Sequence, residues 1–125
     1  MKIEHSVAVI TGGASGLGLA TVEKFVSLGA KVAIFDFNET LGLAVVERLG
    51  SQVMFAKVNV ADEDSVQAAI DQTIAHFGAI HICINYAGIG NAGKTLGKKG
   101  VLPLADFNKV LQVNLVGTFN VLRLA

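Results

Sequence analysis

The stretch VAVITGGASGLG, residues 7–18, decides the fold of this chain. An apolar run typical of a buried strand, Val7–Ile10, leads into a glycine-rich turn, and a helical pattern follows the turn. Glycines at such a turn let the backbone bend tightly and approach an anion, while free N–H groups at the start of the helix attract it. The stretch therefore predicts a strand, a phosphate-binding turn and a helix.

The spacing of the glycines narrows the kind of site. Thr11 precedes a Gly-x-x-x-Gly-x-Gly pattern rather than the more general Gly-x-Gly-x-x-Gly of dinucleotide-binding turns. We expect six residues of the turn to bind a dinucleotide: Thr11, Gly12, Ser15, Gly16, Leu17 and Gly18. The alternative is an ordinary glycine-rich turn between a strand and a helix.

Asp36 is the next candidate. It ends the apolar run Val32–Phe35, roughly 20 residues after the glycine turn, where a carboxylate accepts hydrogen bonds from the hydroxyls of the adenosine ribose. This charge repels a 2′-phosphate, and no Lys or Arg stands in the turn or immediately after Asp36. The sequence therefore predicts NAD as the cofactor, with Phe37 at the same site. The alternative is an aspartate that caps the following helix or turn.

Composition limits the other classes of function. The 125 residues suffice for one domain at most, and the ten basic and ten acidic residues balance, so neither nucleic acid nor an anionic membrane is indicated as a partner. No apolar run approaches the length of a membrane span, and residues 1–5 lead into a strand without a signal-peptide pattern, which predicts the cytoplasm. Cys83 has no second cysteine, so we expect neither a disulfide nor a metal site, but a small buried hydrophobic residue.

Strand and helix patterns alternate along the whole chain. Four near-continuous apolar runs predict buried parallel strands at Val7–Thr11, Lys31–Asp36, Val53–Val60 and His81–Asn85. The alternation predicts an α/β fold, a Rossmann-type doubly wound parallel sheet with its first four strands in the order 3-2-1-4 and incomplete at the edge of the fourth strand. NAD is expected across the carboxyl ends of these strands.

Helical spacing fills the gaps between the strands. One helix is expected to follow Asn38 and end at Gly50, a second to follow Asp62 or Asp64 and end at Gly78, and the last to run from near Asp106 to Ala125. The segment from Ala87 to about Pro103 is a long loop, and loops of this length are usually functional or mobile.

These motifs resemble those of the short-chain dehydrogenase/reductase family, whose Thr-Gly-x-x-x-Gly-x-Gly pattern Thr11, Gly12, Gly16 and Gly18 match. Asn85-Tyr86-Ala87-Gly88 is similar to the family's Asn-Asn-Ala-Gly motif, with Tyr86 in place of the second Asn. The resemblance implies that Asn85, Ala87 and Gly88 steady the sheet and line the floor under the nicotinamide ribose, and that Asn59 and Val60 lie beside the adenine. The motif at residues 85–88 also fits a strand-ending turn in which Gly88 takes a positive φ.

The same resemblance implies a catalytic role for Asn114, in the run VNLVG, residues 113–117. Asn114 matches the Asn of the family's catalytic tetrad, which holds a water in the proton relay. An Asn among apolar residues within a helix lowers helix stability, which favours a function, although a capping or back-bonding Asn is the alternative.

Residues 7–125 resemble one group of this family in particular, the type 2 3-hydroxyacyl-CoA dehydrogenases. The run KTLGKKG, residues 94–100, is similar to an insertion in that group, and Lys94, Lys98 and Lys99 are candidates to attract the phosphates of an acyl-CoA substrate. The alternative is a solvated charged loop. The resemblance also implies a homo-oligomer, a tetramer or dimer, that interconverts a secondary alcohol and a ketone.

The family's catalytic Ser and Tyr-x-x-x-Lys do not occur in this sequence, because the single tyrosine, Tyr86, is followed four positions later by Gly90. We therefore expect residues 1–125 to be the amino-terminal half of an NAD-dependent dehydrogenase. The alternative is a non-catalytic dinucleotide-binding module or sensor, and a methyltransferase is a distant third. Asn114 and the insertion favour the dehydrogenase, since a binding module needs neither.

Overall fold

The computed structural model describes residues 2–90 and 94–125. A four-stranded parallel sheet forms the centre, built from β1 (Val7–Thr11), β2 (Lys31–Asp36), β3 (Val53–Lys57) and β4 (Ile82–Asn85). The strand order is β3-β2-β1-β4, which confirms the predicted topology of an α/β Rossmann-type sheet. β1 pairs with β2 and β4, so that Val9 lies between Ala33 and Cys83, and β2 pairs with β1 and β3. In the described sheet, β3 and β4 are therefore the edge strands.

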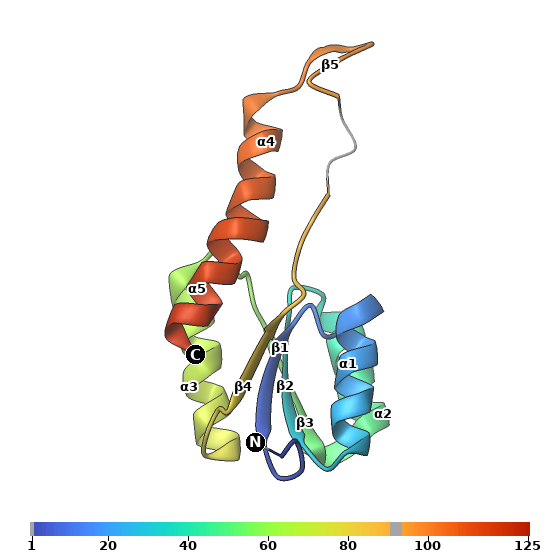
Figure 1. Ribbon diagram of the computed structural model, residues 1–125, viewed down its shortest axis with the longest axis vertical. Coiled ribbons are helices and arrows are strands. Elements are labelled where there is room, and N and C mark those ends of the chain that lie inside the picture. Colours follow the sequence, from blue (N-terminus) through green and yellow to red (C-terminus); the bar gives the residue numbers. More distant parts are fainter. Residues whose placement is uncertain (1, 91–93) are drawn as a thin grey trace.

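Helices cover both faces of the sheet (Figure 1). α1 (Gly16–Ser27) and α2 (Glu39–Leu49) lie on one face, and α3 (Glu63–Phe77) and α5 (Gly117–Leu124) lie on the other. Successive residues of a strand point to opposite faces, so Ile10 packs with Val22 on the first face and Val9 packs with Ile70 on the second. This double burial explains why the strands are continuous apolar runs rather than alternating ones.

Local capping sets the helix boundaries. The Asn38 side chain accepts a hydrogen bond from the Leu41 N–H (3.0 Å) at the start of α2. Of the two candidates for the N-cap of α3, Asp62 is the cap, because its Oδ1 accepts hydrogen bonds from the N–H groups of Asp64 and Ser65. Gly50 and Gly78 end α2 and α3 as predicted.

The third strand is shorter than its apolar run predicted, ending at Lys57 rather than Val60. The Val58 N–H still bonds to the Asp36 carbonyl, but Asn59 then forms a turn in which its Oδ1 accepts from the Ala61 N–H (3.1 Å). Val58 and Val60 are buried because they pack under α3 and α5, not because they belong to the sheet. A run of buried apolar residues has the same sequence pattern whether its backbone forms a strand or a turn, so the pattern did not reveal where the strand ends.

Three further features differ from the expectation, the first being that β4 begins at Ile82 rather than His81. The last helix begins as α4 (Leu104–Leu111), two residues earlier than Asp106, and continues through a π-helical turn (Gln112–Val116) into α5. In this turn the Gly117 N–H bonds to the Gln112 carbonyl, five residues back. The segment before α4 contains a two-residue antiparallel pair, β5 (Leu96–Gly97) with β6 (Gly100–Val101), which projects from the sheet with α4 (Figure 1).

The continuous helix from α4 to α5 carries an apolar surface with no cover in the described part of the chain. Its exposed members are Leu104, Phe107, Leu111, Leu115, Val116, Phe119 and Leu122. Patches of this kind on soluble proteins mark contact surfaces or lead to aggregation. Among the described strands, β4 has no partner on its outer side, so its edge adds unpaired backbone groups next to this surface.

We therefore expect the isolated 125-residue polypeptide to be poorly soluble or to self-associate. Sizing chromatography coupled to light scattering measures this directly. Substituting Phe107 and Phe119 with Gln should move the polypeptide toward the monomer, because both side chains are more than half exposed, at 51% and 62%. A stable, monodisperse monomer of the unmodified polypeptide would contradict the expectation.

Candidate functional site: a cleft at the carboxyl ends of the strands

A cleft of about 820 Å³ opens where the four parallel strands end. The segments that follow these strands line it: the glycine-rich turn after β1, Asp36 and Phe37 after β2, residues 58–61 after β3, and residues 86–89 after β4. Ligands of open parallel α/β sheets bind in this position, because the loops diverge at the point where the strand order reverses.

The glycine-rich turn presents bare backbone to the cleft. Gly12 and Gly16 adopt positive φ values of 67° and 56°, which L side chains rarely adopt. A Cβ on Gly18 would collide with the Gly12 carbonyl oxygen, whereas a Cβ on Gly16 would meet no atom within 4 Å. Ser15 and the first three residues of α1 line the cleft. The first backbone hydrogen bond of this helix runs from the Leu19 N–H to the Ser15 carbonyl. The preceding N–H groups are therefore available to an anion.

Asp36 lies at the wall of this cleft, and two backbone N–H groups hold its carboxylate. Oδ2 accepts from the Ala14 N–H (3.1 Å), and Oδ1 accepts from the Asn38 N–H (2.9 Å). Each carboxylate oxygen keeps a second lone pair for a ligand hydroxyl. Of the alternative, the helix cap belongs to Asn38, whereas the bond from the Asn38 N–H to Asp36 Oδ1 is a turn cap of the kind that the alternative expected. Asp36 also joins the glycine turn to the end of β2.

Asn59 and Val60 form the wall next to Asp36 and Phe37. The Asn59 side chain accepts from the Ala61 N–H, and its backbone N–H donates to the Ser65 hydroxyl (3.1 Å). One lone pair of the Asn59 amide oxygen is thus used by the turn, and one remains.

Thr11 and Asn85 lie behind the cleft instead of lining it. Thr11 is fully buried, and its hydroxyl oxygen accepts from the N–H groups of Tyr86 (3.1 Å) and Ala87 (3.0 Å) and donates to Asn85 Oδ1 (3.5 Å). These bonds tie the end of β4 to the end of β1. The two residues therefore fix the position of Ala87 and Gly88, which do line the cleft.

Asn114 lies in the π-helical turn and holds the chain after β4. Its Oδ1 accepts from the Ile89 N–H and its Nδ2 donates to the Ile89 carbonyl, both at 2.8 Å. A Cβ on Gly88 would lie 3.2 Å from Asn114 Oδ1, which explains the glycine there. The suggested positive φ at Gly88 is wrong, because the described glycines with positive φ are others.

Sequence reasoning missed several residues that line the cleft: Phe35, Val58, Ala61, Tyr86, Ile89, Lys109, Gln112 and Val113. Gln112 and Val113 lie three and four residues after Lys109, just before Asn114, which places all three on one side of the helix. This spacing is a signal in the sequence from which they could have been predicted. Tyr86 is fixed by its hydroxyl, which lies 2.9 Å from the Thr21 hydroxyl on α1. Among the lining residues, Asp36 carries the negative charge and Lys109 the positive charge.

Other candidates lie away from this cleft or play no part in it. Lys94 and Lys98 line a separate shallow depression at the β5–β6 pair, and Lys99 is exposed beside them. Cys83 is half-buried rather than buried, because β4 is an edge strand, and burial raises the pKa of its thiol. Within residues 2–90 and 94–125, no cluster of three metal-ligating side chains occurs and no helix has the length and apolarity to cross a membrane.

Known proteins are similar in sequence to this chain along nearly all of its length. The chain is 48% identical to the 3-hydroxyacyl-CoA dehydrogenase type-2 of Homo sapiens, with 98% of this chain and 48% of that protein covered. It is 41% identical to the protein of the same name from Drosophila melanogaster, with 98% of this chain and 49% of that protein covered. The chain therefore spans about half the length of these relatives.

Solved structures share the fold. A short chain dehydrogenase/reductase from Burkholderia phymatum in complex with NAD superimposes with a TM-score of 0.90 at 32% identity, covering 99% of this chain and 44% of that one. The 3-ketoacyl-(acyl-carrier-protein) reductase from Brucella melitensis complexed with NADH gives 0.89 at 30% identity, covering 97% and 49%. The family model for short chain dehydrogenase matches residues 6–125, and the chain belongs to that family.

Proposed function

We propose that this chain is the amino-terminal, cofactor-binding half of an NAD-dependent dehydrogenase that interconverts a secondary alcohol and a ketone. The observation that supports this most is the convergence on one cleft of a bare glycine turn, the Asp36 carboxylate and the turn at Asn59 and Val60. Both structural neighbours described above were solved with NAD or NADH. We propose NAD as the cofactor here, which supplies a hydride acceptor when bound.

The residues divide the binding of NAD among them. Backbone N–H groups at Ser15 to Gly18 suit the pyrophosphate, because the positive end of α1 lies there. The Asp36 carboxylate suits the ribose hydroxyls, and Phe37, Asn59 and Val60 border the place of the adenine. Ala87 and Gly88, held by Thr11 and Asn85, border the nicotinamide end. Asn114 holds the chain after β4 through Ile89, which uses one of its two N–H groups and one of its two oxygen lone pairs, so its amide keeps the capacity for the catalytic role that the family resemblance implies.

For the substrate we propose a 3-hydroxyacyl-CoA, the compound in the name of the type-2 relatives, and as its product the 3-oxo form. Lys94, Lys98 and Lys99 support this, since a mobile cation attracts a polyanion such as CoA without fixed geometry. The uncovered apolar surface of α4 and α5 supports a dimer or tetramer. A chain with one cysteine and no partner for it fits the cytoplasm.

Turnover by the full-length protein tests the proposal. With acetoacetyl-CoA and NADH we expect oxidation of NADH, followed at its absorbance band, and the reverse reaction with 3-hydroxybutyryl-CoA and NAD. The 125-residue polypeptide alone should show no turnover, because the family's Ser and Tyr-x-x-x-Lys are not among its residues. Tight NADH binding by the full-length protein without turnover on any hydroxyacyl-CoA would instead favour a dinucleotide-binding module.

A further inference from the structure

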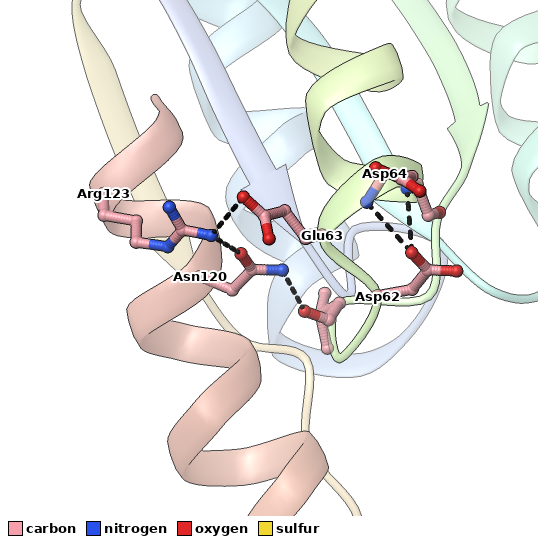
Figure 2. Close-up of polar contacts among 7 residues, drawn as sticks. Asp62, Glu63, Asp64, Asn120 and Arg123 are labelled. Carbon is pink, nitrogen blue, oxygen red and sulfur yellow. Dashed lines mark hydrogen bonds and ion pairs between the residues drawn. The ribbon is translucent and has the colours of Figure 1, made fainter.

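A buried amide on α5 contacts the wall of the cleft from behind. Asn120 is 5% exposed, and its Nδ2 donates to the Val60 carbonyl at 3.0 Å (Figure 2). Val60 lines the cleft, and 60 positions separate the two residues in the sequence. This bond therefore links the last helix to the turn after β3.

The neighbouring contacts fix the direction of the Asn120 amide. Arg123 Nη2 donates to Asn120 Oδ1 (3.1 Å) and also lies 3.0 Å from Glu63 Oε1, at the first position of α3 (Figure 2). An arginine only donates and a carbonyl only accepts, so the amide oxygen must face Arg123 and the amide nitrogen must face Val60. The Arg123–Glu63 pair is partly exposed, and such pairs add little stability. Its effect is to orient the amide.

A second contact from α5 presses on the same residue. Gly117 is buried, and a Cβ there would lie 2.5 Å from Val60 Cγ2. The helix therefore approaches the turn closely at Gly117 and bonds to it one turn later, at Asn120. Two hydrogen bonds hold the turn from its other side: the Ala61 N–H donates to the Asn59 side chain, and the Asn59 N–H donates to the Ser65 hydroxyl. The position of Val60 is thus set by contacts on both sides.

We infer that Asn120, oriented by Arg123 and Glu63, is a positioning residue that sets the adenosine-binding wall of the cleft. This inference rests on the proposed function, in which the end of the cleft at Asp36, Phe37 and Val60 receives the adenosine half of NAD. The network ties the Val60 carbonyl to α5 and so keeps the Val60 side of the wall at a fixed distance from Asp36. Among the described residues, the hydrogen bonds and the ion pair of this network do not include the glycine turn, Ala87 or Gly88.

The predicted effect is selective for the adenosine half. In the full-length protein, Asn120→Leu and Asn120→Asp both lose the donor to Val60, and the aspartate keeps the acceptor for Arg123. We expect both variants to weaken binding of AMP and of NADH by about tenfold, because the unpaired Val60 carbonyl turns toward water in the free protein and re-forming the wall around the ligand costs part of that gain. Affinity for nicotinamide mononucleotide, which lacks adenosine, should stay within about twofold, because the network does not reach that end of the cleft. Titration calorimetry with the three ligands measures the difference.

Two further variants keep the test decisive if those substitutions prevent folding. Gly117→Ala pushes on Val60 without touching any hydrogen bond, and should also weaken AMP more than nicotinamide mononucleotide. Arg123→Leu should weaken AMP by about two- to threefold, because it loosens the amide without removing the donor. Arg48→Leu is the matched control, since Arg48 forms a similar exposed pair with Glu23 between α1 and α2, away from the cleft. It should leave all three affinities unchanged.

The outcomes separate this inference from the proposed function. If the unmodified protein binds neither AMP nor NADH, the proposed function fails, and the inference fails with it. If the unmodified protein binds both and the Asn120 and Gly117 variants bind AMP equally well, only the inference is overturned. A parallel loss of AMP and nicotinamide mononucleotide would also overturn it, because a general loosening of the fold affects both halves of the cleft.

Discussion

Replacing Asp36 with Ala and Phe37 with Arg is expected to change the preferred cofactor of the full-length protein from NAD(H) to NADP(H). The unmodified protein should prefer NAD(H), since a 2′-phosphate at the Asp36 carboxylate would bring like charges into contact. That costs several kcal/mol, which corresponds to roughly a hundredfold or more in kcat/KM. Phe37 is 67% exposed at the cleft, so an arginine there reaches a phosphate without disturbing the core.

The structure adds one cation that the sequence pattern did not reveal near this position. Lys57 is the register partner of Asp36 on β3. Its ammonium lies 4.0 Å from Glu39 Oε2 and 5.2 Å from the Phe37 ring centroid. The Lys57 charge is therefore partly compensated by Glu39, and the NAD preference should stand.

Measured kcat/KM values for both cofactors decide this prediction. Asp36→Asn is the matched control, because it removes the charge and keeps the shape. It should lose most of the discrimination against NADP(H) without gaining a phosphate ligand. Equal efficiency of the unmodified protein with both cofactors would show that Asp36 does not select between them.

Gly16→Val and Gly18→Val are expected to abolish binding of the dinucleotide, each by a different route. A side chain at Gly16 enters open space within the cleft, so the protein should fold with about 1–2 kcal/mol of backbone strain at a positive φ and lose NADH affinity by more than about a hundredfold. A side chain at Gly18 collides with the Gly12 carbonyl oxygen and must displace α1 from the glycine turn. Gly18→Val should therefore lose stability as well as binding.

Titration calorimetry with NADH and a thermal unfolding curve separate the two routes. Gly78→Val is the matched control for Gly16, because Gly78 has a left-handed backbone with a φ of 86° and also no atom within 4 Å of an added Cβ, but lies at the end of α3. It should show the same strain and unchanged affinity. Unchanged affinity in a folded Gly16→Val protein would remove the phosphate-binding role of the turn.

Much of the fold follows from patterns that are local in the sequence. Apolar runs of strand length, the glycine turn and the caps at Asn38 and Asp62 are each specified within a few residues, and alternation of strand and helix then leaves few topologies. The end of β2 at Asp36 was predicted because a charged residue interrupts a buried run. The end of β3 was not, because Val58 and Val60 stay buried after the backbone has left the sheet.

For the candidate site, the sequence determined that residues after the strands gather at one cleft, since parallel strands bring their carboxyl ends to one edge. Gly12, Gly16, Gly18, Asp36 and Asn59 all line that cleft. The tertiary structure alone decided what the remaining polar groups do. Thr11 joins β4 to β1, Asn114 holds Ile89, and Asn120 holds Val60. Each of these bonds joins residues 25 or more positions apart, and a polar side chain carries no mark of its partner until packing brings that partner within hydrogen-bonding distance.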